Sequence, residues 1–349
     1  MTHKSDRRDF IQASTVAAAG MTVAGGYQVT QGKQPADVQD NANTTFREKL
    51  LRCLGGPWPE PCDLKPEVAK VEQKDGYRLE HVSYEVEPDD RVPAIMIIPD
   101  GISASSPAAG VAIWHQHNGQ WHLGKSEPAG LAGNKMHHTG VELAKLGYAV
   151  LCPDALCFED RQDPDEKLKK AQYEAFEFLR YTVAGKCMAW KNILDMRRAV
   201  DYFVSRPEVI ADRIGCYGHS MESTHTWLVG PWEPRLKALV GNCCLPTYAA
   251  IHRTKLLHCY PNYVPGLFEF GDTPDIAGLI APRALHLNLG ENDKGSPIEE
   301  ARAGVDRIAK AYEAAGAADK FSWFVEPDTG HVLSEAMWQR VQDTFKKHL

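Results

Sequence analysis

Short apolar runs alternate with helix-like stretches through most of this 349-residue chain. The clearest apolar runs lie at 110–115, 149–152, 214–217, 238–240, 284–289 and 321–325. Helical spacing of apolar residues is clearest over 186–205. Short buried strands that alternate with helices form a mostly parallel sheet covered on both faces. Two earlier strand-like runs, 77–86 and 92–98, can pair antiparallel at one edge. The predicted fold class is therefore α/β.

The first residues have a different composition from the rest of the chain. Arg7 and Arg8 precede a small, weakly apolar run that ends at Gly26, a layout typical of a twin-arginine export signal. Residues 1–26 are therefore predicted to be a signal segment, too short and too rich in Ala and Gly for a stable membrane span. The protein is expected in the periplasm or outside the cell.

Beyond the signal, composition predicts a spacer and one folded domain. Residues 27–45 are rich in Gln, Asn, Thr and Asp, which indicates a flexible spacer. Residues 46–349 are long enough for a single α/β domain. Within it, 154–185 is charged and aromatic without a clear strand pattern, and we expect a lid-like excursion there.

Charge and cysteine content limit the possible partners. The net charge is -7, and acids and bases are mixed along the chain without a basic stripe, so nucleic acid is not an expected partner. The nine cysteines cannot all pair. Cys53 and Cys62 flank a Gly-Gly-Pro-Trp-Pro turn and could form a disulfide in an oxidising compartment, but no pattern requires it. The oligomeric state is left open.

The strongest chemical signal is the segment CYGHSMES at 216–223. A strand runs into Gly-x-Ser and then into a predicted helix, and such a turn projects a serine hydroxyl toward a base. Gly218 leaves the room that this turn needs, and Ser220 is the candidate nucleophile. The Met221 N–H, at the start of the helix, is a predicted oxyanion donor. The structural alternative is a serine that merely caps the helix.

Glu222 departs from the small residue that this turn usually carries two positions after the serine. A glutamate there must point outward or find a partner, because an unpaired buried carboxylate is costly. The first turn of a helix tolerates negative charge, but a charge near a developing oxyanion would slow acyl transfer. A catalytically impaired binding protein therefore stays as an alternative.

Two later segments supply a base and an acid. His331 lies in the loop between the last strand and the last helix, where it can take and return the serine proton. Asp293 follows an earlier strand and gives the chain order Ser, Asp, His. Glu291, two residues before it, is the competing acid. A surface histidine without a catalytic role is the alternative for position 331.

The loop HQHNG at 115–119 follows an apolar strand, where a second oxyanion donor is expected. The predicted donor is the Gln116 backbone N–H. His115, His117 and, from the serine turn, His219 are predicted to contact substrate. His115, His117 and His122 also suggest zinc, but neither a carboxylate nor a cysteine falls between 111 and 126. No metal and no organic cofactor is predicted.

A family resemblance rests on several short segments of this chain. They are SRPEV at 205–209, DRIG at 212–215, GHSM at 218–221, APR at 281–283, GEND at 290–293 and GH at 330–331. Together they resemble the dienelactone hydrolase and acetyl xylan esterase-like branch of the α/β-hydrolases, from about residue 80 to the C-terminus. True dienelactone hydrolases are less similar, since they commonly use a cysteine nucleophile and position 220 is serine.

The resemblance implies the α/β-hydrolase fold and a serine esterase that cleaves carboxylic esters, including acyl esters of carbohydrates. It implies no metal or organic cofactor. A peptidase of the same fold remains a further alternative. Four tryptophans either line a sugar-binding surface or fill the core, namely Trp121, Trp190, Trp227 and Trp232.

Overall fold

The structure, a computed structural model, describes residues 45–349 except residue 244. The predicted signal segment, and the predicted spacer up to residue 44, lie outside the described residues. The first described helix, α1, begins at Phe46 behind a Thr45 side-chain cap. Cys53 and Cys62 are both free thiols. Among the described helices, none is long and apolar enough to cross a membrane.

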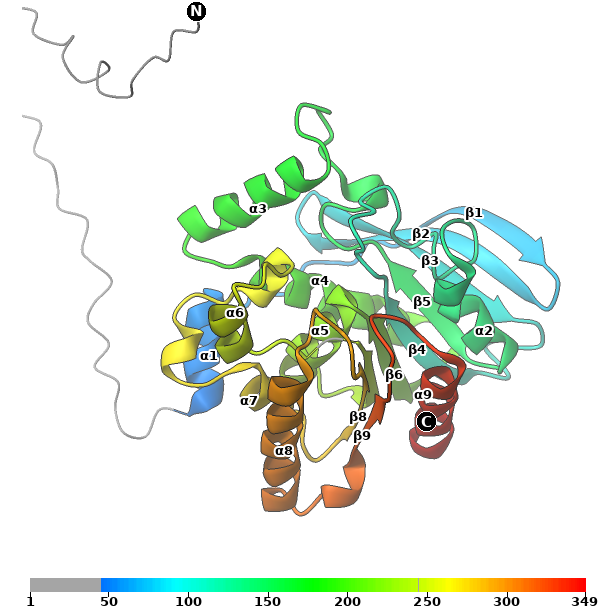
Figure 1. The fold of residues 1–349 in the computed structure, drawn as a ribbon. Helices are drawn as coiled ribbons and strands as arrows, with labels where there is room; N and C mark the ends of the chain where they lie inside the picture. The colour runs from blue at the N-terminus through cyan, green and yellow to red at the C-terminus, as the bar shows by residue number, and fades with distance from the viewer. Residues whose placement is uncertain (1–44, 244) are drawn as a thin grey trace, which may run out of the picture. The chain divides into compact units, whose positions relative to one another are not determined.

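A nine-stranded sheet forms the centre of the described chain, in the order β1-β2-β3-β5-β4-β6-β7-β8-β9 (Figure 1). The strands are β1 (Glu67–Lys74), β2 (Tyr77–Glu87), β3 (Asp90–Pro99), β4 (Ala108–Trp114), β5 (Ala149–Pro153), β6 (Val209–His219), β7 (Leu236–Asn242), β8 (Ala284–Gly290) and β9 (Phe321–Glu326). Pairing is antiparallel from β1 through β3 to β5 and parallel from β5 to β9. The predicted antiparallel pairing of the two early strands is therefore confirmed, and β1 lies outside them as the edge strand.

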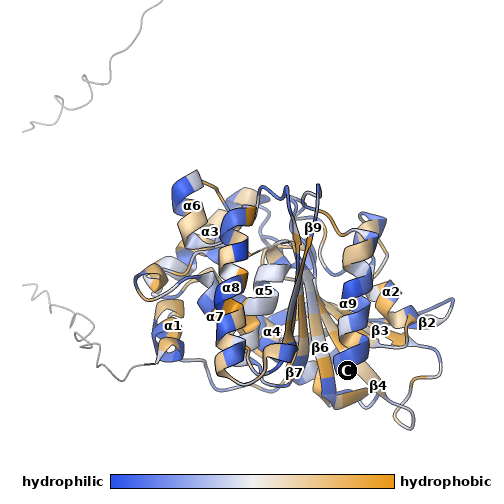
Figure 2. Cartoon of the chain, turned by 60° about the horizontal axis from the view of Figure 1, so that its bottom comes forward, coloured by the Kyte–Doolittle hydropathy of each residue, from blue (hydrophilic) through white to orange (hydrophobic). Residues whose placement is uncertain are grey.

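Helices cover both faces of the sheet, as the alternating pattern predicted. They are α1 (Phe46–Leu54), α2 (Thr139–Lys145), α3 (Ala171–Val183), α4 (Met188–Ser205), α5 (Met221–Val229), α6 (Tyr248–Thr254), α7 (Thr273–Gly278), α8 (Ile298–Ala314) and α9 (Glu335–His348). In Figure 2, α2 and α9 lie on one side of the sheet, and α4, α5 and α8 lie on the other. Each layer buries an apolar stripe against the strands.

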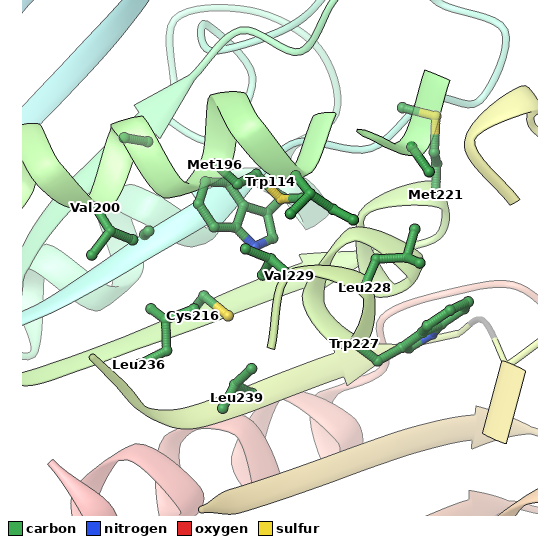
Figure 3. Close-up of a cluster of buried hydrophobic side chains, with 14 of the residues drawn as sticks. Trp114, Met196, Val200, Cys216, Met221, Trp227, Leu228, Val229, Leu236 and Leu239 are labelled. Atoms are coloured by element: carbon green, nitrogen blue, oxygen red, sulfur yellow. The ribbon is translucent and has the colours of Figure 1, made fainter. Parts of the chain in front are cut away.

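The larger half of the core lies between α4, α5 and the central strands (Figure 3). Cys216 on β6 and Trp114 on β4 are buried there beside Met196 of α4. Trp190 and Trp227 are 1% and 0% exposed, so these two indoles fill the core rather than line a sugar site. The packed central strands provide a fixed base for the loops at their carboxyl ends.

Two elements differ from what the sequence indicates. β1 was not predicted, because it is an edge strand whose residues are mostly exposed and charged, and so it lacks the apolar alternation of a half-buried strand. The excursion at 154–185 contains a regular helix, α3, which carries buried Glu174 and Glu177. The inward face of this helix is partly acidic, so the helix lacks the apolar periodicity by which a helix is recognised in a sequence.

Candidate active site

A tight turn joins β6 to α5 and carries Ser220. Ser220 has φ 66° and ψ -122°, and its N–H donates to the carbonyl of Asn242 at 2.9 Å. This positive φ is rare for a residue with a side chain and directs the serine out of the turn. A β-carbon on Gly218 would lie 2.0 Å from the Glu222 carbonyl oxygen. The predicted strand-turn-helix arrangement is thus present, with Ser220 at its apex.

Ser220, His331 and Asp293 form a continuous chain of hydrogen-bonding distances. His331 Nε2 lies 2.8 Å from Ser220 Oγ, and His331 Nδ1 lies 2.8 Å from Asp293 Oδ2. The Asp293 side chain is 1% exposed, and its other oxygen accepts the Gly295 N–H at 2.8 Å. Glu291, the competing acid, instead accepts the N–H of Asp328 at 3.1 Å. This geometry allows the imidazole to take the serine proton while the carboxylate fixes its tautomer.

Strand register explains why these distant segments meet. In the parallel part of the sheet, Trp114 pairs with Gly218, and Asn242 pairs with both His219 and Asn288. The carboxyl ends of β4, β6, β7 and β8 therefore lie side by side, and the loops that follow share one edge. Gln116 is the second residue after Trp114, so it lies in the loop at this edge.

An open pocket of about 420 Å³ lies at this edge. Its lining consists of His117, Asn118, Ser220, Leu256, Leu257, His258, Cys259, Asn292, Asp293, Lys294, Gly295 and His331. Burial lowers the pKa of His258 to about 4, so this imidazole is neutral at neutral pH. The pocket is large enough for a small substrate and has polar groups around Ser220.

The two predicted oxyanion donors lie in the loop after β4 and at the start of α5. Met221 is the first residue of α5, and the first N–H groups of a helix have no partner within the helix. Gln116 is buried, and its amide donates to Glu127 at 2.8 Å and to Gln120 at 3.1 Å. These side-chain bonds hold the loop backbone in place.

The three histidines predicted to contact substrate have different positions. His117 lines the pocket. His115 and His219 are 3% and 4% exposed and do not line it. His115 Nε2 accepts the Ala155 N–H at 3.0 Å, and the Asn242 amide lies 2.8 Å from His219 Nδ1. Because both rings are enclosed beneath the loops, the structure offers substrate contact only to His117.

Helix α3 contacts the loop through a single buried carboxylate. Glu174 Oε2 lies 3.0 Å from His117 Nε2 and accepts the Trp121 Nε1–H at 2.8 Å. His117 Nδ1 accepts the Gly119 N–H at 2.8 Å, so its hydrogen is on Nε2 and is donated to Glu174. The excursion is therefore bonded to the loop that carries His117.

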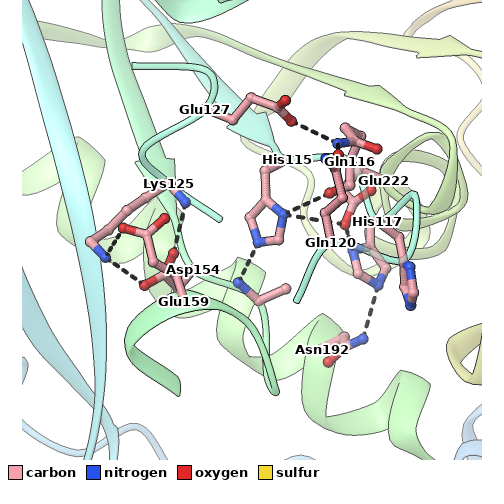
Figure 4. A network of polar contacts seen from close by, with 12 residues as sticks. His115, Gln116, His117, Gln120, Lys125, Glu127, Asp154, Glu159, Asn192 and Glu222 are labelled. Atoms are coloured by element: carbon pink, nitrogen blue, oxygen red, sulfur yellow. Dashed lines mark hydrogen bonds and ion pairs between the residues drawn. The ribbon is translucent and has the colours of Figure 1, made fainter. Parts of the chain in front are cut away.

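Glu222 neither points outward nor forms a direct hydrogen bond. Its side chain is fully buried, and both carboxylate oxygens lack a hydrogen-bond partner among the described residues. His115 Nδ1 and His225 Nδ1 lie 3.9 and 4.0 Å from Oε1, and Figure 4 shows His115 beside the carboxylate. Burial raises the pKa of Glu222. The carboxylate does not line the pocket that holds Ser220.

Two groups of metal-ligand side chains occur among residues 45–349 apart from 244. One is Cys243 with Asp293 and His331, and the other is Asp154 with Glu159 and Asp160. The Lys125 ammonium occupies the second group, at 2.8, 2.7 and 2.8 Å from its three carboxylates. Figure 4 shows it beside Asp154 and Glu159. The zinc alternative considered for His115, His117 and His122 corresponds to neither group.

Sequence reasoning missed two residues that support the site. Asn242 accepts the Ser220 N–H through its carbonyl, and its amide also donates to the Val332 carbonyl at 3.2 Å. The sequence signal that could have identified Asn242 is its position at the end of the strand that follows the serine turn. Glu174 lies 57 positions from His117, and no local pattern linked the two.

Comparison with known proteins gives the family. The model of the Abhydrolase family matches residues 58–329. The chain belongs to the Abhydrolase family. YtaP of Bacillus subtilis (strain 168), whose name places it with the hydrolases and names no substrate, is 33% identical to this Abhydrolase-family chain over 293 residues. That match covers 82% of this chain and 92% of YtaP.

Solved structures show the same fold as this Abhydrolase-family chain. A glucuronoyl esterase from Solibacter usitatus superposes with a TM-score of 0.62 and 16% identity, covering 86% of this chain and 91% of its own. Acetyl xylan esterase 1 from Thermoanaerobacterium sp. JW/SL YS485 gives 0.60 and 16%, covering 86% and 93%. The predicted α/β-hydrolase fold is confirmed.

Proposed function

We propose that this protein is a serine hydrolase that cleaves carboxylic esters, including acyl esters of carbohydrates. The observation that carries the proposal is the unbroken chain from Ser220 Oγ through His331 to the buried Asp293 carboxylate, with 2.8 Å at each step. It opens onto a pocket of about 420 Å³. A nucleophile, a base and an orienting acid in this order are what acyl transfer requires.

The proposed reaction has two halves. Ser220 attacks the ester carbonyl while His331 takes its proton, and Asp293 stabilises the imidazolium. The Met221 and Gln116 N–H groups hold the oxyanion of the tetrahedral intermediate. His331 then returns the proton to the leaving alcohol, which leaves an acyl-enzyme. Water, activated by the same imidazole, releases the acid and restores the serine.

Two observations support the proposed substrate class. Asn118, Asn292 and Lys294 give the pocket polar edges, which suits a hydroxylated alcohol group. The two solved relatives are named for acetyl xylan and glucuronoyl esters. The buried position of Glu222, outside the pocket lining, argues against the impaired binding protein.

The test is intact-mass spectrometry after treatment with a fluorophosphonate, followed by turnover of p-nitrophenyl acetate and of acetylated xylo-oligosaccharides. We expect one adduct on the wild type, and we expect Ser220→Ala to lose both the adduct and the turnover while it keeps its circular dichroism spectrum. Turnover by Ser220→Ala at the wild-type rate would overturn the proposal.

A further inference from the structure

A second, smaller cavity of about 20 Å³ lies beneath the loop that carries Gln116. It shares no lining residue with the pocket that holds Ser220. Its polar lining consists of His115, Asp154, Asn192, Asp195, Glu222 and His225. A cavity of this size holds one water molecule when several polar groups face it.

Glu222 gives the strongest evidence that this cavity contains a hydrogen-bonding group. Its carboxylate is fully buried, and neither oxygen has a hydrogen-bond partner within residues 45–349 apart from 244. Asn192 Oδ1 is also buried without a partner. Buried polar groups in folded proteins are almost always bonded, either to protein or to ordered water.

Two imidazoles face the carboxylate with a hydrogen on the near nitrogen. His115 Nε2 accepts the Ala155 N–H at 3.0 Å, so the ring hydrogen is on Nδ1, which also lies 3.2 Å from the Gln116 carbonyl oxygen. His225 Nε2 lies 2.9 Å from the Asn192 amide nitrogen, which favours the same tautomer. The two Nδ1 atoms are 3.9 and 4.0 Å from Glu222 Oε1, too far for a direct bond.

We propose that one water molecule occupies this cavity and bonds to Glu222, His115 and His225. This inference rests on the proposed esterase function and adds a positioning residue to it. Glu222 directly follows Met221, and His115 directly precedes Gln116. The bridge therefore joins the neighbours of the two proposed oxyanion donors and sets the spacing between those donors.

A metal ion fits the same groups less well. Nitrogen and oxygen ligands of zinc lie at about 2.0–2.2 Å from the ion, which places them closer together than 3.9 Å. The three residues are also absent from the metal-ligand groups found among the described residues. A nitrogen that carries a hydrogen offers no lone pair to a cation.

The test combines a crystal structure of the wild type with kinetics of Glu222→Gln, Glu222→Leu and His225→Leu. We expect density for a single water in the cavity. Glu222→Gln keeps the shape and the hydrogen-bonding groups, so its kcat should stay close to that of wild type. Glu222→Leu and His225→Leu should lower kcat about 10- to 100-fold with little change in KM, since they misplace an oxyanion donor.

Glu233→Leu is the matched control, because Glu233 is also a buried glutamate but bonds to Arg235, away from the pocket. It should lower the melting temperature and leave kcat unchanged. An empty cavity, a metal-like peak, or unchanged kcat in folded Glu222→Leu would overturn the inference. If Glu222→Leu fails to fold, the wild-type density and the His225→Leu kinetics decide. Absence of fluorophosphonate labelling in the wild type would instead count against the proposed function itself.

Discussion

A β-carbon on Gly218 would lie 2.0 Å from the carbonyl oxygen of Glu222. The end of β6 and the first turn of α5 therefore approach so closely that position 218 accommodates no side chain. Ser220 lies between them with a positive φ. The geometry of the serine turn thus depends on a missing side chain as much as on the serine.

Gly218→Ala should therefore damage both the turn and the activity. Separating β6 from α5 to fit one methyl group is an overpacking change, and such changes cost about 1–3 kcal/mol. Urea unfolding measures this loss, and p-nitrophenyl acetate turnover should fall far more than the folded fraction does. A variant with wild-type unfolding and turnover would show that the backbone around Ser220 adapts freely.

The identity of the orienting acid can be decided by two neighbouring substitutions. Asp293→Asn should lower kcat about 10³- to 10⁴-fold, because an amide at this position supports the wrong imidazole tautomer. Glu291→Gln is the matched control and should stay near the wild-type rate, since Glu291 bonds to a backbone N–H rather than to His331. A larger loss of kcat in Glu291→Gln than in Asp293→Asn would instead identify Glu291 as the orienting acid.

Lys125 should be among the most important charged residues for stability. Its ammonium contacts three carboxylates, and its side chain is only 6% exposed. Lys125→Met leaves the fully buried Asp154 carboxylate without its cation and should lower the free energy of unfolding by about 3–5 kcal/mol. Lys145→Met, which removes an exposed pair with Glu142, should change it by less than about 1 kcal/mol. Equal effects of the two changes would contradict this assignment.

Acid should destabilise the fold through its buried histidines. Burial lowers the pKa of His225 from its ordinary 6.5 to about 3, and burial also keeps the pKa of His219 well below 6.5. Below pH 6.5 the unfolded imidazole binds a proton that the folded one does not, so the free energy of unfolding decreases as the pH is lowered. Each such group contributes about 1.4 kcal/mol per pH unit between the two pKa values.

His225→Gln should make this pH dependence shallower by the contribution of one group. The measurement is urea unfolding of wild type and variant at a series of pH values between 6.5 and 4. Identical slopes for the two proteins would mean that His225 is protonated in the folded state.

Much of the site was readable from sequence because each part has a local signal. Ser220 lies between a strand and a helix, and Asp293 and His331 each follow a strand in the expected order. Parallel strands bring such loop residues to one edge of the sheet whatever their separation along the chain. The fold class followed from the same alternation of strands and helices.

The remaining features depend on packing between distant segments. The sequence suggests that Glu222 turns outward or finds a partner, but the carboxylate enters a cavity beside Trp114 and Met196. The burial of His115 and His219 likewise depends on how the loops cover them. The size of such a cavity and the cover of such loops arise from many side chains at once, and periodicity in one segment does not reveal them.

The bond from Glu174 to His117 has a mechanical consequence. If α3 swung away from the body, it would remove the acceptor shared by His117 and Trp121 and would leave two N–H donors without a partner. The position of α3 and the shape of the loop that brings His117 to the pocket are therefore coupled. A ligand that displaces this helix would also change the loop beside Ser220.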